Sequence, residues 1–179
     1  MEFDKVIESR RSIRHYDAEK KVSREQIEEM LEAAIQAPSW KNSQTARYYV
    51  VMGQELLETV RTDCLPAFNA NNVSGASALI VTSFVKSRSG FGPDGIPSNE
   101  LGEGWGFYDL GLHNEHLVLK AADLGLDTLI MGIRDADKLR ALLDIPKEEI
   151  IVAVISVGYR AQDAAMPKRK SVAEIARFY

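Results

Sequence analysis

Short apolar runs that alternate with segments of helical periodicity restrict the fold of this chain more than any other feature of its sequence. Four runs have the length and composition of buried strands, at Tyr48–Met52, Ala78–Phe84, Thr128–Ile133 and Ile150–Val157. Apolar residues with helical spacing lie between them, after Gly53, at Tyr108–Leu124 and at Ala136–Leu143. Because a sheet and an amphipathic helix must each bury an apolar face, this alternation predicts a single sheet covered by helices.

Two helices are predicted in the N-terminal part of the chain, before the first strand. The first is short, with Phe3 and Val6 on one face, and it ends at a basic run. The second begins at Ser23 and Gln26, which have the spacing of a capping box. It ends before Pro38, because proline disfavours helical backbone at the residue that precedes it.

The segment Lys86–Gly106 is predicted to be a loop. It holds six of the twelve glycines together with Pro93 and Pro97, a composition that resists regular structure. A loop of this length usually serves a function or is mobile, so it is expected to be either a lid or a disordered excursion. The tail Tyr159–Tyr179 has little helix or strand signal before Val172.

Composition limits the function classes that fit this sequence. The 179 residues fit one domain, and the net charge of -4 offers no general attraction to nucleic acid, so phosphate binding would need a local basic site. The N-terminus has no apolar run of signal-peptide length, and no stretch of the sequence approaches the length of a membrane span, so a cytoplasmic protein without membrane partners is expected. Cys64 is the only cysteine, which excludes an internal disulfide and a thiolate-held cluster. Redox chemistry would therefore require a bound organic cofactor.

Several familiar motifs fail. Gly102-Glu103-Gly104-Trp105-Gly106 is followed by Phe107, so no GxGxxG dinucleotide motif is completed, and no P-loop motif occurs. His113 and His116 have i, i+3 spacing that could present two imidazoles to a metal, or they could be polar positions at a helix surface or dimer seam. No third ligand is evident, so no metal site is predicted. Cys64 is interpreted as a small core residue.

The basic run after the first helix is a candidate anion site. Arg10, Ser12 and Arg14 alternate, so their side chains would point the same way in an extended segment. Two guanidinium groups around a hydroxyl suit the oxygens of a phosphate or carboxylate. A solvated basic turn would have the same sequence, and the run by itself leaves both readings open.

Further motifs give this run a context. The chain continues with Ala37-Pro38-Ser39-Trp40-Lys41-Asn42-Ser43-Gln44, so an R-R-S-x-R run precedes A-P-S-x-x-N-x-Q. In this order and separation the sequence resembles the nitroreductase family. Similar features extend the resemblance over essentially the whole chain: Phe68-Asn69, Ala121–Leu126, Ile130-Met131-Gly132 and Lys168-Arg169-Lys170.

The resemblance implies a fold and an activity. The implied fold is α+β, a three-layer sandwich with a central mixed or antiparallel sheet flanked by helices, in an intertwined homodimer. A single domain 1–179 would include a lid at 86–106 and a C-terminal arm at 159–179. The implied enzyme binds FMN between the subunits, takes electrons from NADH or NADPH, and passes them to a nitroaromatic, a quinone or a similar small acceptor by ping-pong transfer. No catalytic side chain is obligatory, because FMN carries the chemistry.

The resemblance also implies the residues that contact FMN. The N-terminal contacts are Arg10, Arg11, Ser12 and Arg14, and the C-terminal cations at the phosphate are Lys168, Arg169 and Lys170, of which the one that reaches it is left open. The segment given by the partner subunit is Pro38, Ser39, Trp40, Asn42 and Gln44. Asn69 would bond the pyrimidine edge of the ring, with Asn72 nearby, and the strand end Ile130, Met131 and Gly132 would approach flavin N5.

Some alternatives stay open. Some family members have a lysine where this chain has Asn71-Asn72, and we hypothesise that Arg14 supplies the missing charge near flavin N1. Read singly, Trp40 could be a packing aromatic, Asn69 and Asn72 turn residues, Gly132 a strand end, and the three C-terminal cations a solvated tail. The rival functions are another flavin enzyme on the same scaffold (a reductive dehalogenase or a flavin-fragmenting enzyme), a flavin storage protein without turnover, and a purely structural dimer module.

Overall fold

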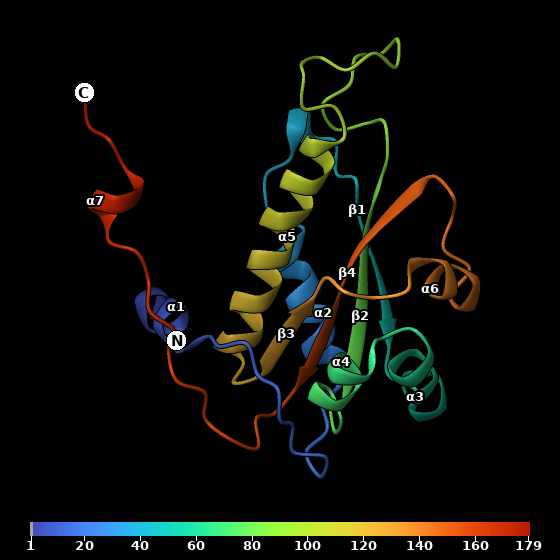
Figure 1. Ribbon diagram of the computed structural model, residues 1–179, viewed down its shortest axis with the longest axis vertical. Coiled ribbons are helices and arrows are strands. Elements are labelled where there is room, and N and C mark those ends of the chain that lie inside the picture. Colours follow the sequence, from blue (N-terminus) through green and yellow to red (C-terminus); the bar gives the residue numbers. More distant parts are fainter. Residues whose placement is uncertain (1) are drawn as a thin grey trace.

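The computed structural model describes residues 2–179, and a single antiparallel sheet lies at its centre (Figure 1). Its four strands are β1 (Ala46–Val51), β2 (Ala78–Val85), β3 (Asp127–Met131) and β4 (Glu149–Gly158), in the order β1-β2-β4-β3. Every neighbouring pair is antiparallel. The four predicted strands are thus confirmed to within three residues at either end, and of the two sheet types left open the antiparallel one is present.

Helices cover both faces of this sheet, which gives the three layers that the family resemblance implied. On one face pack α2 (Arg24–Ala34) and α5 (Gly104–Asp123), and on the other α3 (Gln54–Asp63), α4 (Ala67–Asn72) and α6 (Ala136–Leu142) (Figure 1). Successive side chains of a strand point to opposite faces. In β2, Ile80 therefore packs with α2 and α5, whereas Leu79 and Val81 pack in the core on the other face.

The sequence determines where α2 begins through a side-chain cap. Ser23 Oγ accepts from the Gln26 backbone N–H at 3.2 Å, and the Gln26 side chain accepts from the Ser23 backbone N–H at 3.0 Å, so the predicted capping box of α2 is confirmed. The helix α5 begins at Gly104, a turn earlier than Tyr108, where the apolar pattern starts. A glycine inside that first turn, Gly106, leaves room for the Phe84 ring to pack against the helix.

The loop between β2 and α5 folds back on itself. Gly92 N–H donates to Ile96 O, and Ser98 N–H donates to Gly90 O, each at 2.8 Å. Phe91 and Pro97 face each other in an isolated bridge inside this turn. The loop therefore has a defined path in which a turn projects beyond the sheet (Figure 1).

The two ends of the chain lie apart from the sheet. The helix α1 (Phe3–Ser9) contacts α5, and the C-terminal stretch leads away from the sheet to the short helix α7 (Val172–Ile175) (Figure 1). From Ala161 to Tyr179 every residue is exposed except two partly buried alanines. In residues 2–179, no helix combines the length and the apolar character that a membrane span requires.

Candidate functional site

The basic run after α1 lies in an extended segment beside β3. Ser12 pairs with Thr128 in a parallel bridge, and Ile13 N–H donates to Thr128 O at 3.0 Å. Ile13 is buried in the core, whereas Ser12 and Arg14 are exposed. The expected alternation is therefore present, with Ile13 as the anchor and the hydroxyl and guanidinium on the outer side. We call residues Arg10–Arg14 together with β3 the basic edge.

Buried polar contacts hold the basic edge in place. Asp127, at the start of β3, is buried and accepts from Arg160 through Nη2 at 2.6 Å and through the backbone N–H at 2.9 Å. These hydrogen bonds raise the pKa of the Arg160 guanidinium above its usual value. Tyr16 is buried with its hydroxyl 2.8 Å from Ser156 Oγ, and burial raises the pKa of its phenol. The first contact fixes β3 to the start of the C-terminal arm, and the second fixes the N-terminal segment to β4.

The arginines of the basic edge differ in their partners. Arg11 donates through Nη1 to the carbonyls of Glu8 and Arg10 at 2.6 and 2.7 Å, and its buried Nε has no partner in the part of the chain that the structure describes. Arg14 donates to Ser12 O at 3.3 Å. Within residues 2–179, the guanidinium of Arg10 has no hydrogen-bond or ion-pair partner. Arg10 is thus a cation held at the edge by its backbone and left with its full donor set for a ligand.

Asn69 lies beside the far end of the basic edge. It is buried on α4, and its Nδ2 donates to Ile133 O at 3.0 Å, which brings α4 against the residues that follow β3. Asn72 is half-buried on the same short helix. The reading of Asn69 and Asn72 as turn residues is therefore wrong, because they form a helix too short to leave a periodic apolar pattern in the sequence.

The strand end beside Asn69 has three different environments. Met131 is buried in the core, so only its backbone can face a ligand, whereas Ile130 is exposed. A Cβ built on Gly132 would meet no atom within 4 Å. Nothing in the chain itself therefore requires a glycine at this position, and a requirement would have to come from a ligand or a second subunit.

The C-terminal cations and the predicted partner segment lie elsewhere. Lys168, Arg169 and Lys170 are exposed on the arm that leaves the sheet. The segment Pro38–Gln44 contacts the first turns of α5, toward the opposite end of this helix from the basic edge (Figure 1). One chain therefore does not bring the three groups of predicted contacts together.

The segment Pro38–Gln44 has an unusual backbone. Lys41, Asn42 and Gln44 have φ of 47°, 55° and 49°, values in the left-handed region that side chains other than glycine rarely adopt. Gln44 N–H donates to Ser39 Oγ at 3.1 Å and holds the turn closed. The Trp40 indole N–H is buried without a partner in residues 2–179. Strained residues of this kind gather at ligand sites, which makes the turn a candidate for function.

An aromatic cluster with a buried carboxylate stands behind this turn. The rings of Trp40 and Trp105 lie 4.6 Å apart, and those of Trp105 and Tyr108 lie 5.7 Å apart. Asp109 is buried and accepts from the Trp40 backbone N–H at 2.9 Å and from Ser89 Oγ. We call Pro38–Gln44, the loop 86–106 and the first two turns of α5 the aromatic corner. Trp40 thus has a packing role here, which leaves a role toward a ligand open.

Asp109 and the Asp127–Arg160 pair are the residues that sequence reasoning missed. The only signal for Asp109 was a carboxylate next to Leu110, near the start of a predicted helix that is apolar on more than one side. Neither aspartate has a partner within helical spacing, because Asp109 meets Trp40 and Ser89, and Asp127 meets Arg160, only after the chain has folded.

The remaining candidates from the sequence separate in the structure. His113 is buried and donates through Nδ1 to Asp109 O at 2.8 Å, whereas His116 is exposed with its Nδ1 3.2 Å from Ala33 O. Residues 2–179 hold no group of three potential metal ligands. Cys64 is buried, as expected of a core residue, and burial raises the pKa of its thiol.

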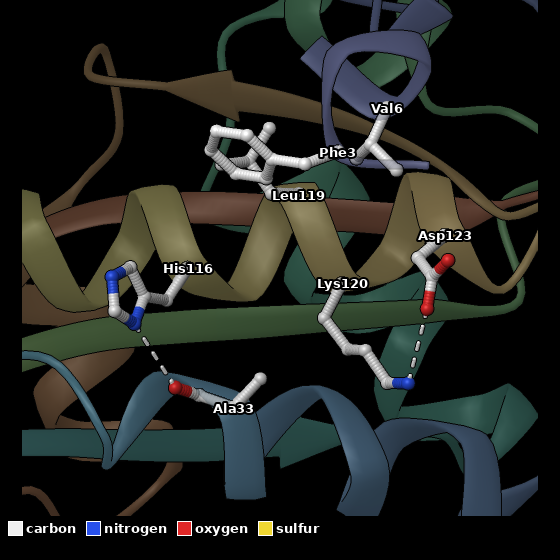
Figure 2. A pocket seen from close by; sticks show the side chains of 7 residues that line it. All are labelled: Phe3, Val6, Ala33, His116, Leu119, Lys120 and Asp123. Carbon is white, nitrogen blue, oxygen red and sulfur yellow. Dashed lines mark hydrogen bonds and ion pairs between the residues drawn. The ribbon is translucent and has the colours of Figure 1, made fainter. Parts of the chain in front are cut away.

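A groove between α1, α2 and α5 holds none of the predicted contacts. Figure 2 shows Phe3 and Val6 of α1 above Leu119 of α5, and the space they line measures about 350 Å³. His116 and Lys120 lie along the α2 side, each held by a polar contact. The groove therefore has an apolar floor with polar margins, the character of a contact surface more than of a site for chemistry.

A four-stranded antiparallel sheet between two helical layers, with three arginines along the basic edge, defines an α+β protein with a candidate anion site. The sequence profile of the Nitroreductase family matches residues 7–159, and the chain therefore belongs to the nitroreductase family.

Relatives and solved structures agree with this membership. A protein of Archaeoglobus fulgidus, provisionally named an NADH dehydrogenase/NAD(P)H nitroreductase, is 32% identical over 87% of this chain and 83% of its own length. A provisionally assigned nitroreductase of Exiguobacterium sibiricum 255-15, solved in complex with FMN, is 25% identical with a TM-score of 0.87 and covers 100% of this chain and 98% of its own. A nitroreductase family protein of Streptococcus pneumoniae TIGR4, 21% identical with a TM-score of 0.86 over 99% of this chain and 100% of its own, shows the fold alone.

Proposed function

We propose that this protein is an FMN-dependent oxidoreductase that takes electrons from NADH or NADPH and reduces electron-poor acceptors such as nitroaromatics or quinones. The observation that carries the proposal is the basic edge, where the Arg10 guanidinium has no partner among the described residues and Ser12 and Arg14 are exposed on one extended segment. The FMN complex of the Exiguobacterium relative and the NAD(P)H nitroreductase name of the Archaeoglobus relative support it.

The residues of the basic edge fit a flavin mononucleotide. Arg10 and Ser12 would hold the phosphate by charge-assisted hydrogen bonds, with Arg11 as a further cation. Asn69 already donates through Nδ2, so its Oδ1 is left to accept from the N–H of a pyrimidine ring. The backbone of Met131 and Gly132, flanked by Ile130, would face the ring at a point where no side chain intervenes. When bound, FMN would supply the hydride chemistry, and the chain would bind, orient and exclude water.

We further propose that the site is completed by a second copy in a homodimer. A single chain keeps the aromatic corner and the basic edge apart, so the Pro38–Gln44 turn would flank the FMN bound by the partner. The arm 159–179 exposes Val172, Ile175 and Phe178 and buries little against its own chain, which suits a segment that packs on another copy. It would carry Lys168, Arg169 or Lys170 to the phosphate. In this arrangement 1–179 is one FMN-binding domain, and 86–106 is the lid.

The absorption spectrum of the purified protein tests the cofactor directly. Two visible bands of bound flavin are expected in the wild-type protein. An Arg10→Ala variant is expected to bind FMN about 30- to 150-fold more weakly, the loss of one charge-assisted contact worth about 2–3 kcal/mol. Arg24→Ala is the matched control, because Arg24 is an exposed arginine of α2 that pairs with Glu28. Equal FMN affinity in both variants would contradict the role of Arg10.

Anaerobic mixing with NADH and NADPH separates the proposed activity from its rivals. Rapid bleaching of the flavin, followed by reoxidation with a quinone or nitroaromatic, is expected. Slow or absent bleaching would indicate a storage protein, and cleavage of a carbon–halogen bond or of the flavin itself would indicate another enzyme on this scaffold. A colourless protein that gains no thermal stability from FMN would favour the remaining rival, a purely structural dimer module.

A further inference from the structure

One buried carboxylate joins the two halves of the aromatic corner. Asp109 is 3% exposed, and a single oxygen, Oδ2, accepts from the Trp40 backbone N–H at 2.9 Å and from Ser89 Oγ. Trp40 begins the strained turn, and Ser89 belongs to the loop 86–106. Because a buried acceptor stripped of its donors costs about 1–3 kcal/mol, the carboxylate holds turn and loop in one arrangement.

Aromatic packing couples the same two segments. The rings of Trp40 and Trp105 lie 4.6 Å apart with planes tilted by 51°. The indole N–H of Trp105 donates to Asn99 Oδ1 at 2.9 Å, so Trp105 is also bonded to the loop. A Cβ on Gly90 would lie 2.6 Å from Trp105 Cδ1, which shows how closely the loop backbone packs on this ring. Turn, loop and Trp105 therefore form one packed unit.

We propose that Asp109 is a positioning residue that fixes Trp40 and Trp105 as a rigid aromatic wall, and that this wall sets the affinity for planar aromatic acceptors. The part that concerns acceptors rests on the proposed function, in which the Pro38–Gln44 turn flanks the flavin of the second copy. Aromatic faces held at a fixed angle favour a planar ring beside them.

The effect of Asp109 should appear in KM more than in kcat. Asp109 is buried behind Trp40 and reaches a bound acceptor only through the wall. In a variant without the Asp109 contacts, the wall is mobile before the acceptor binds. Binding must then order the wall, and this entropy cost weakens the affinity for the acceptor. The interactions lost are made equally in the ground state and the transition state, so KM rises while kcat is nearly unchanged.

A second acidic residue of the same region provides a matched control. The Glu103 carboxylate accepts from the Ser87 backbone N–H at 2.9 Å and from Ser87 Oγ at 3.0 Å. Glu103 therefore anchors the base of the loop, as Asp109 does, without contacting Trp40. A change to glutamine removes the negative charge, which weakens the hydrogen bonds at the base of the loop, and leaves the link between loop and turn intact.

The two tryptophans give the experiment a readout that does not depend on flavin. They are the only tryptophans of the chain, and both lie in the wall. Their separation should produce an exciton-coupled circular dichroism couplet, which a fixed geometry maintains. FMN-free and FMN-loaded protein would be compared for wild type, Asp109→Ala, Asp109→Asn, Ser89→Ala and Glu103→Gln, with a naphthoquinone as the acceptor.

Loss of the couplet and a rise of about tenfold in the naphthoquinone KM, with kcat within about twofold, are expected for Asp109→Ala. Asp109→Asn should retain most of the couplet and a KM close to that of wild type, because its amide oxygen can accept in place of Oδ2. Ser89→Ala removes one of the two hydrogen bonds to Asp109 and should raise KM about threefold. It takes the place of Asp109→Ala if that variant does not fold. Glu103→Gln should keep the couplet and a KM within about twofold of wild type.

An unchanged couplet in Asp109→Ala, or equal KM values for it and Glu103→Gln, would overturn the proposal. If the wild-type protein neither binds FMN nor reduces an acceptor, the proposed function is refuted, together with the part of this proposal that concerns acceptor affinity. The couplet of the FMN-free variants would still decide whether Asp109 fixes the wall.

Discussion

The basic edge and the aromatic corner are built in opposite ways. At the basic edge, regular extended backbone is paired with β3, and a buried ion pair and a buried hydroxyl pair fix it. At the aromatic corner, three residues in the left-handed region and a glycine-rich loop are held by ring packing and by Asp109. The first suits a rigid grip on a cofactor phosphate, and the second suits a surface whose shape is set by a few contacts and can be altered by single substitutions.

Breaking the ion pair of the basic edge should have the largest effect on stability. Asp127→Ala leaves Arg160 without its buried partner, and we expect the free energy of unfolding to fall by about 3 kcal/mol. This value is the lower end for a broken buried ion pair, because the Arg160 side chain is one-third exposed. Asp163→Ala removes the other partner of Arg160, which is 94% exposed, and should cost at most about 0.5 kcal/mol. Urea unfolding measures both, and equal losses would contradict the assignment of Asp127 as the anchor.

A methyl group at the aromatic corner should have the next largest effect. A Cβ on Gly106 would overlap the fully buried Phe84 ring, so Gly106→Ala should destabilise the fold by about 2 kcal/mol. Gly111→Ala, on the same helix, meets no atom within 4 Å and should stabilise by about 0.5–1 kcal/mol through helix propensity. Thermal unfolding compares the pair. A Gly106→Ala protein as stable as wild type would show that the Phe84 ring can move aside at little cost.

The contrast between the regions also explains what could be predicted from the sequence. Strand positions and the Ser23 capping box depend on local patterns, and these predictions are confirmed. Alternation indicated only that Arg10, Ser12 and Arg14 would point the same way if the run were extended, and the structure shows an extended segment beside β3. Strand order and the choice of an antiparallel sheet depend on contacts between distant segments, which no local pattern records.

The aromatic corner was predicted only in outline, for the same reason. Glycines and prolines marked 86–106 as a loop, but the partners of Asp109 come from two other segments of the chain. The helix α4 was not predicted, because six residues are too few to show helical periodicity. Residues that position others are the hardest to identify from one sequence, since their types say only that they are polar.

Removing the buried hydroxyl of the basic edge should have a smaller effect with a distinct pH signature. Tyr16→Phe leaves Ser156 Oγ without its partner and should cost about 1 kcal/mol near neutral pH. Burial raises the pKa of Tyr16 above the ordinary value of about 10, so the folded state holds this proton more tightly than the unfolded state.

The stability that Tyr16 contributes is therefore complete below about pH 10 and is lost as the pH rises through the folded pKa. The phenylalanine variant should lose less stability than wild type above about pH 10, where ionisation of Tyr16 in the unfolded state costs the wild type about 1.4 kcal/mol for each pH unit. Tyr179→Phe, at the exposed C-terminus, should behave as wild type. Parallel alkaline profiles for Tyr16→Phe and wild type would show that Tyr16 ionises freely in the folded protein.

The smallest expected effect concerns charge at the basic edge and sharpens the contrast with the aromatic corner. If Arg14 supplies the positive charge beside bound flavin, it stabilises the negative charge of the reduced ring, so Arg14→Ala should lower the midpoint potential. Arg14 is exposed, which limits the shift to the equivalent of about 0.5–1 kcal/mol and makes it shrink as salt is added. Arg14→Lys should retain most of the potential, since it keeps the charge. An unchanged potential in Arg14→Ala would assign the role to another cation, whereas a shift equally large in Asp109→Ala would mean that the two regions are not separable in function.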